Sequence, residues 1–203
     1  MAAAQLLDDV GFAELLVPID TTTDPAFRAL LAEAGRRSVR ITIASQGDRL
    51  QGLGDEVSVL SPSWRNRSFY MTGLLELARI PLVIRVGRLG QGILLAGSVT
   101  DDWSLGGTDL KSAVMLAAQE GSLKANSDRL LARVAPSLLV VGSRNRARPE
   151  LVRRAERHRI AVHSLRLDGA LICTFSGDSL SVAAPFRSAA PETAVSEPGP
   201  TAL

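Results

Sequence analysis

Short runs of branched apolar residues, each bounded within a few positions by glycine or charged side chains, dominate this sequence. The clearest pair, residues 81–86 and 91–96, flanks the loop Gly87-Arg88-Leu89-Gly90. Glycines in such a loop can adopt the positive φ that a β-hairpin requires. Because runs of this length form strands, the pattern predicts a fold built on a sheet, with an antiparallel part at this hairpin.

The N-terminal part alternates strand and helix signals. Asp24 is placed to cap a helix, Pro25 suits its first position, and apolar residues then recur on one helix face until Gly35 ends it. Residues 15–19 and 39–43, on either side, are short and apolar. This order predicts strand, helix, strand, which is the beginning of an α/β fold.

A second hairpin is predicted from residues 49–51 and 56–60, around Gly52-Leu53-Gly54-Asp55. Residues 67–79 fit neither the helix nor the strand period, and we assign them to a short helix or an insertion.

The C-terminal half alternates more regularly. A strand is predicted at residues 113–117, a helix at 126–134, a strand at Leu138–Val141 and a basic helix from Pro149 to His158. Residues 160–167, 170–175 and 179–183, separated by Asp168-Gly169 and Gly177-Asp178, predict two successive hairpins.

The composition sets the domain boundaries. With 46% hydrophobic and 22% charged residues, the chain can bury one core, so residues 1–185 are predicted to form a single α/β domain. Residues 186–203 are almost free of bulky apolar side chains and are predicted to be a disordered tail.

No apolar stretch approaches the roughly 20 residues that cross a bilayer. The start Met1-Ala-Ala-Ala lacks the features of a secretion signal, so we expect no membrane segment and a cytoplasmic protein. The single Cys173 lies in an apolar run and is expected to be an inert thiol.

The order of these elements resembles the end of the soluble metallo-β-lactamase-like domain in the competence DNA-uptake channel family, ComEC. That family has a strand, a His-His-Gly-Ser loop, a helix, a strand, an Asn-Arg turn, a helix and an Asp-Gly-Ala hairpin. Upstream lies an apolar strand that ends in Gly-Asp. The matching residues are Ile93 to Ser98, Val114 to Ser122, residues 130–136 and 138–142, Asn145-Arg146, Pro149-Glu150-Leu151 and Asp168-Gly169-Ala170, within a resemblance that spans residues 15–182.

The resemblance implies a partial metallo-β-lactamase-like β-sandwich with outer helices and a mixed sheet with C-terminal hairpins. It also implies that the metal-ligand positions are lost, since they are occupied by Ser98, Gln119, Glu120 and Arg148. Metals of this fold need clustered imidazole and carboxylate groups. We therefore expect no catalytic residues, no bound metal and no cofactor, and a structural or binding role related to DNA uptake.

The family's His-rich run would precede the strand at residues 15–19, and it is absent from the sequence. A half-domain would expose unpaired strands, so self-association or a companion chain that supplies the missing half is expected. An alternative hypothesis is a metallo-hydrolase completed by such a partner.

Positive charge is concentrated in one segment, although the formal net charge is only +2. Candidate contacts to phosphates of nucleic acid are Arg144, Arg146, Arg148, Arg153 and Arg154. A solvated basic helix face would explain the same residues without any ligand.

A further alternative rests on the run from Leu138 to Asn145, which resembles the phosphate-binding turn of universal stress proteins. This resemblance implies a nucleotide-binding module centred on residues 142–146.

Overall fold

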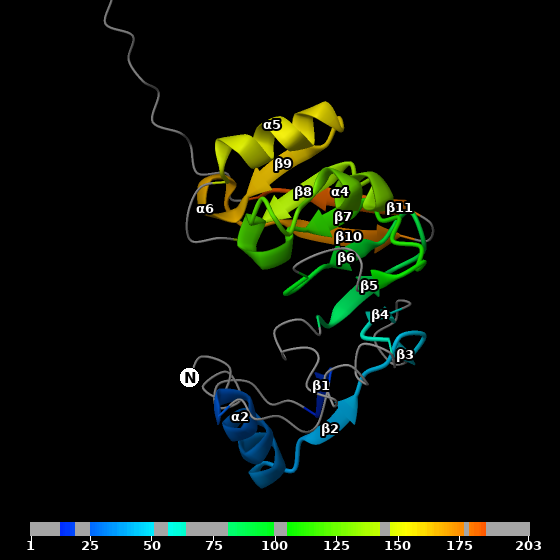
Figure 1. The fold of residues 1–203 in the computed structure, drawn as a ribbon, viewed down its shortest axis with the longest axis vertical. Coiled ribbons are helices and arrows are strands. Elements are labelled where there is room, and N and C mark those ends of the chain that lie inside the picture. Colours follow the sequence, from blue (N-terminus) through cyan, green and yellow to red (C-terminus); the bar gives the residue numbers. More distant parts are fainter. Residues whose placement is uncertain are drawn as a thin grey trace, which may run out of the picture.

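The computed structural model describes residues 13–18, 25–50, 57–63, 81–99, 105–142, 147–176 and 179–185. Its largest element is a seven-stranded sheet whose strands follow one another in chain order (Figure 1). These strands are β3 Arg49–Leu50, β4 Val57–Ser61, β5 Val83–Val86, β6 Ile93–Leu95, β7 Val114–Leu116, β8 Leu138–Val141 and β9 Ala161–Ser164. In the described residues the architecture is thus mixed α/β with a large mixed sheet and few helices, as the sequence predicts.

The first half of this sheet is antiparallel, from β3 to β6. Both predicted hairpin pairings are confirmed, although residues 51–56, between β3 and β4, lie outside the described part. Gly87 and Gly90, between β5 and β6, have φ values of 89° and 81°. These are the positive angles for which glycine is suited.

The second half, from β6 to β9, is parallel. Parallel neighbours need a crossover connection. Here α4 (Asp128–Val134) connects β7 to β8, and α5 (Pro149–Arg157) connects β8 to β9. The Ser127 hydroxyl caps α4 by accepting the Leu130 N–H at 3.1 Å.

Both helices contribute to the main hydrophobic core of the described residues. Leu130 and Leu131 of α4 and Leu151 of α5 are fully buried there with Leu94 and Leu139 of the sheet. Burial of these side chains stabilises the position of the helices on the sheet.

A smaller unit contains β1 (Glu14–Val17), α2 (Pro25–Arg36) and β2 (Arg40–Ile43), with the two strands parallel. It confirms the predicted strand, helix, strand order. Its small cluster packs Ala34 and Val39 against Leu15 and Leu30. In Figure 1 it lies at the opposite end of the molecule from α5.

The predicted strand at residues 160–167 is wrong in its second half, and the first of the two C-terminal hairpins does not form. Among the described residues β9 pairs only with β8, in parallel, and Leu165–Asp168 form the short helix α6. The reason is local, because the Asp168 Oδ2 accepts the Ser164 N–H at 2.9 Å and stabilises a helical turn. The second hairpin, β10 (Ile172–Ser176) with β11 (Ser179–Ala183), is confirmed.

None of the described helices is long and apolar enough to cross a membrane. The predicted insertion at residues 67–79 and the predicted tail at 186–203 lie outside the described residues.

Candidate functional site

The carboxyl ends of β6, β7, β8 and β9 lie at one edge of the sheet, here called the carboxyl edge, where α6 follows β9 (Figure 1). Ligands of parallel sheets commonly bind beyond this end of the strands. Ser98 follows β6, Gln119 and Glu120 follow β7, and Arg148 precedes α5 after β8. All four residues at the predicted lost metal-ligand positions thus follow strands that end at this same edge.

The loop after β7 is a 3₁₀ turn, Ala118–Gly121, with an uncommon backbone. Gln119 and Glu120 have φ values of 45° and 54°, and Gly121 has 90°. The left-handed region costs a non-glycine residue roughly 1–2 kcal/mol. Both non-glycine side chains are exposed. Backbone strain of this kind occurs preferentially at functional sites.

Two contacts bring this loop against its neighbours. The Gln119 N–H donates to the Gly97 carbonyl at 3.0 Å and so joins the loops after β7 and β6. A Cβ on Gly121 would lie 3.0 Å from Val141 Cγ1 and 3.3 Å from Leu151 Cδ2. The loop therefore packs directly on the end of β8 and on α5.

The buried side chain of Asn126 holds the Ala118–Gly121 loop in place. The sequence did not lead us to predict this role. It is fully buried, its Oδ1 accepts the Ala118 N–H at 2.9 Å, and its Nδ2 donates to the carbonyls of Ala118 at 2.8 Å and Ser122 at 2.7 Å. The sequence did contain a signal for it. Ser127 by itself can cap α4, so the asparagine before it is not needed as a helix cap and is available for another role.

The side chains at the carboxyl edge are one hydroxyl, one amide, one carboxylate and one guanidinium, and all four residues are exposed. In the described part of the chain, no three His, Cys, Asp or Glu residues gather in a group that could hold a metal. His158 Nε2 lies 2.9 Å from Asp128 Oδ1, and His163 Nε2 lies 3.0 Å from the Gly169 carbonyl.

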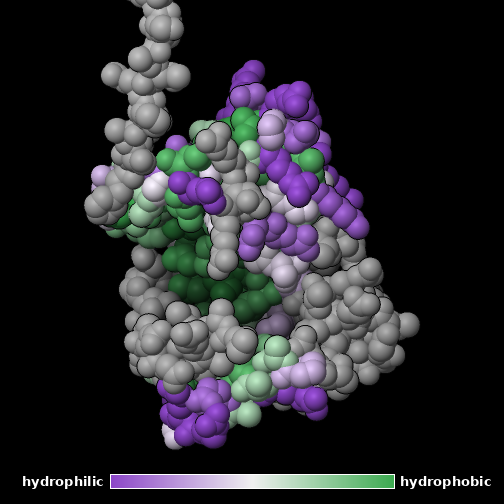
Figure 2. Space-filling model, turned by 90° about the vertical axis from the view of Figure 1, so that its left-hand side faces the viewer, coloured by the Kyte–Doolittle hydropathy of each residue, from purple (hydrophilic) through white to green (hydrophobic). Residues whose placement is uncertain are grey.

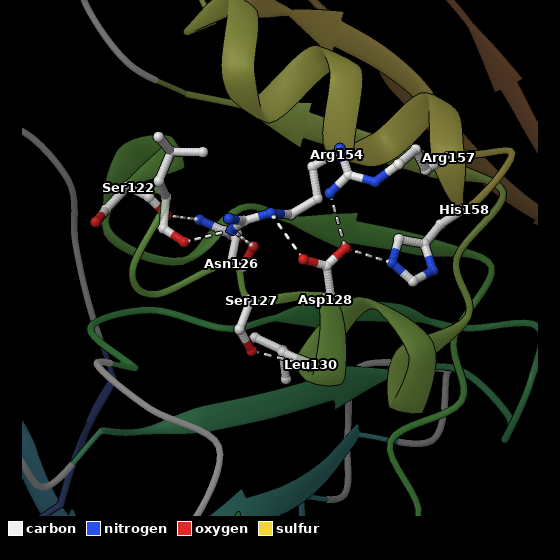
Figure 3. Close-up of polar contacts among 9 residues, drawn as sticks. Ser122, Asn126, Ser127, Asp128, Leu130, Arg154, Arg157 and His158 are labelled. Atoms are coloured by element: carbon white, nitrogen blue, oxygen red, sulfur yellow. Dashed lines mark hydrogen bonds and ion pairs between the residues drawn. The ribbon is translucent and has the colours of Figure 1, made fainter.

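The predicted phosphate contacts differ in their surroundings. Arg154 donates to the carbonyls of Leu123 at 2.5 Å and Asn126 at 2.6 Å, and its Nε lies 3.3 Å from Asp128 Oδ2 (Figure 3). Its guanidinium thus links α5 to the segment before α4. Arg148 and Arg153 are exposed. Arg144 and Arg146 lie outside the described residues. So does most of the segment 142–146, which was the predicted centre of the alternative nucleotide-binding module.

Asp128 faces three basic side chains of the α5 segment, Arg154, Arg157 and His158 (Figure 3). The hydrogen bond from His158, more than the pairing with Arg157 and Arg154, holds the pKa of Asp128 below its ordinary value of 3.8. A lowered folded-state pKa stabilises the protein above the unfolded value, and this contribution is lost as the pH falls through the folded-state pKa.

Asp128→Asn is therefore expected to lower the thermal unfolding midpoint near neutral pH, with a deficit that shrinks as the pH falls below 3.8. Unfolding followed by circular dichroism over this pH range measures both effects. Asp109→Asn is the matched control, because that exposed carboxylate accepts a backbone N–H and joins no ion pair within the described residues. An equal, pH-independent loss in both variants would contradict the prediction.

Cys173, on β10, is half-buried. Burial raises the pKa of its thiol and favours the neutral form. The thiolate is the reactive species, so this environment disfavours a nucleophilic role.

Comparison with known proteins gives no assignment: no family model matches the chain, and no curated protein matches it.

Proposed function

We propose that this chain is a non-catalytic metallo-β-lactamase-like module, related to the ComEC family of DNA uptake, that binds nucleic-acid phosphates at its carboxyl edge. The proposal rests on how the loops at this edge are held together. The hydrogen bond from Gln119 to Gly97 joins the loops after β7 and β6, and the β7 loop packs against β8 and α5. Gln119 and Glu120 keep a costly left-handed backbone although both side chains are exposed. A binding surface would explain why that geometry is retained.

The chemistry at the edge favours an anion over a metal ion. Zinc sites are built from imidazole, thiolate and carboxylate ligands, whereas Ser98 and Gln119 offer only a hydroxyl and an amide. Glu120 supplies a single carboxylate at this edge, and Arg148 would offset its attraction for a cation. A guanidinium has the geometry to bind two oxygens of a phosphate at once.

The C-terminal hairpin covers part of the sheet face opposite α4 and α5, because Leu138 and His163 line a cavity there together with Val182. The proposed sandwich needs a second layer over the rest of this face. Three in-register neighbours on β5, β6 and β7 are Ile84, Leu95 and Leu116. Successive side chains of a strand point to opposite faces of the sheet, so these three lie on the face away from the helix-covered core. Leu95 is 36% exposed. Figure 2 shows a hydrophobic hollow on another side of the molecule, where the parallel strands end. We propose that a second copy or a companion chain covers the exposed part of the sheet face opposite the helices.

Arg148→Ala and Arg153→Ala are each expected to weaken binding of a fluorescent DNA duplex uniformly across sequences and to reduce the salt slope of log K by about 1. Fluorescence anisotropy at several salt concentrations measures both quantities. Lys111→Ala is the control, because this exposed lysine precedes β7 at the opposite edge of the sheet. Absence of DNA binding at low salt, or an equal loss in the control, would contradict the proposal.

Metal analysis separates this proposal from the alternative of a hydrolase completed by a partner. Elemental analysis of the purified chain, alone and with any co-purifying partner, should find no stoichiometric zinc. Phosphodiesterase activity that a chelator abolishes would favour the alternative.

A further inference from the structure

We infer that a second ligand site lies between β9 and the C-terminal hairpin and binds a small primary ammonium compound with an apolar body. A cavity of about 430 Å³ opens there, and none of the four carboxyl-edge positions lines it. Ligand pockets commonly measure roughly 300–1,000 Å³. Its lining includes Leu138, Val162, His163, Asp168, Leu171 and Val182.

The residues that line this cavity are mainly aliphatic, with leucine and valine side chains from β8, β9 and the hairpin, although the surface that they leave accessible is more polar than apolar. The aliphatic side chains gain free energy when they bury an apolar ligand surface. Among the described lining residues, the polar side chains are those of His163 and Asp168. The ligand therefore needs an apolar body with a polar group at one end.

The side chain of His163 is only 11% exposed. Its Nε2 lies 3.0 Å from the Gly169 carbonyl, a contact that requires the proton on Nε2. In the neutral ring Nδ1 then carries a lone pair. Nδ1 lies 3.9 Å from Asp168 Oδ2, which is too long for a direct hydrogen bond.

The Asp168 carboxylate has no Lys or Arg partner among the described residues. Its Oδ2 accepts the Ser164 N–H at 2.9 Å, and its side chain is 31% exposed. Asp128, by contrast, pairs with two arginines, Arg154 and Arg157, and with His158. The polar end of the cavity thus presents a carboxylate whose nearest basic group among the described residues is the His163 imidazole, 3.9 Å away.

An ammonium group matches this arrangement because it carries one positive charge and three donors. With hydrogen bonds of usual length, one nitrogen can donate to His163 Nδ1 and to the Asp168 carboxylate across their 3.9 Å separation. A carboxylate or phosphate ligand would instead be repelled by Asp168. A neutral alcohol would lose the charge-assisted hydrogen bond.

Isothermal titration calorimetry with hexylamine tests this inference, with hexanol and hexanoate as probes of the same apolar length. Hexylamine should bind saturably, hexanol more weakly and hexanoate not at all. Asp168→Asn should weaken hexylamine binding about tenfold or more, since hydrogen bonds to charged groups are among the stronger ones. Asp109→Asn should leave it unchanged, although that carboxylate also accepts a backbone N–H.

Val182→Trp supplies a second variant that keeps the carboxylate but fills the cavity, and it should abolish binding. Circular dichroism of each free variant verifies that it is folded. The inference is overturned if hexanol binds as tightly as hexylamine, if folded Asp168→Asn binds as well as the unchanged protein, or if no probe saturates.

Discussion

Replacing Asn126 by alanine is expected to lower the free energy of unfolding by about 3–5 kcal/mol, because it leaves the buried N–H and C=O of Ala118 without partners and opens a cavity. For a chain of this size the unfolding midpoint would fall on the order of 10 °C. Denaturant unfolding and hydrogen exchange at the Ala118 amide measure the two consequences.

Two further variants test the cause of this loss. Asn126→Asp keeps the volume and the Oδ1 acceptor but directs a second carboxylate oxygen at two carbonyls, so we expect it to be at least as unstable as Asn126→Ala. Ser137→Ala removes an exposed hydroxyl that donates to the Ala113 carbonyl, with an expected cost below about 1 kcal/mol. Similar losses for Asn126→Ala and Ser137→Ala would show that Asn126 does not hold the loop.

Gly121→Ala is expected to cost about 2–4 kcal/mol, from left-handed strain together with overpacking. The φ of Gly121 is 90°, and its added Cβ would lie 3.0 Å from Val141 Cγ1. Because the loop packs on β8 and α5 at this point, DNA binding should weaken in parallel. Denaturant titration gives the stability, and anisotropy gives the binding.

Matched variants separate the left-handed strain of Gly121→Ala from its overpacking. Gly90→Ala has a φ of 81° but open space around the new Cβ, so it should show the strain alone. Glu120→Gly should raise the free energy of unfolding by up to about 1 kcal/mol, because glycine adopts the φ of 54° at this position without strain. A larger loss for Gly90→Ala than for Gly121→Ala would contradict the packing argument.

Local signals predicted the individual elements well. Pro149 at the start of α5 and the glycines between β5 and β6 act within a few residues, so their effect is visible in the sequence. The error at residues 160–167 arose where two local preferences competed. An apolar run favoured a strand, but the Asp168 carboxylate stabilises a helical turn by its bond to Ser164.

The candidate site was predicted only in part. Ser98, Gln119, Glu120 and Arg148 came from a resemblance, and their placement at one edge depends on the parallel order of β6 to β9. The use of Arg154 in a structural link was not foreseen, because its carbonyl partners are 28 and 31 positions away in the chain.

The sequence by itself determined the alternation of strands and helices, most of their bounds and the identity of the side chains at the carboxyl edge. Only the tertiary structure decided that β9 continues the parallel sheet, that Asn126 holds a left-handed loop, and that His163 and Asp168 face one cavity. The physical reason is range. Caps and turns act over one or two helical turns, whereas strand order and burial depend on contacts between segments far apart in the chain.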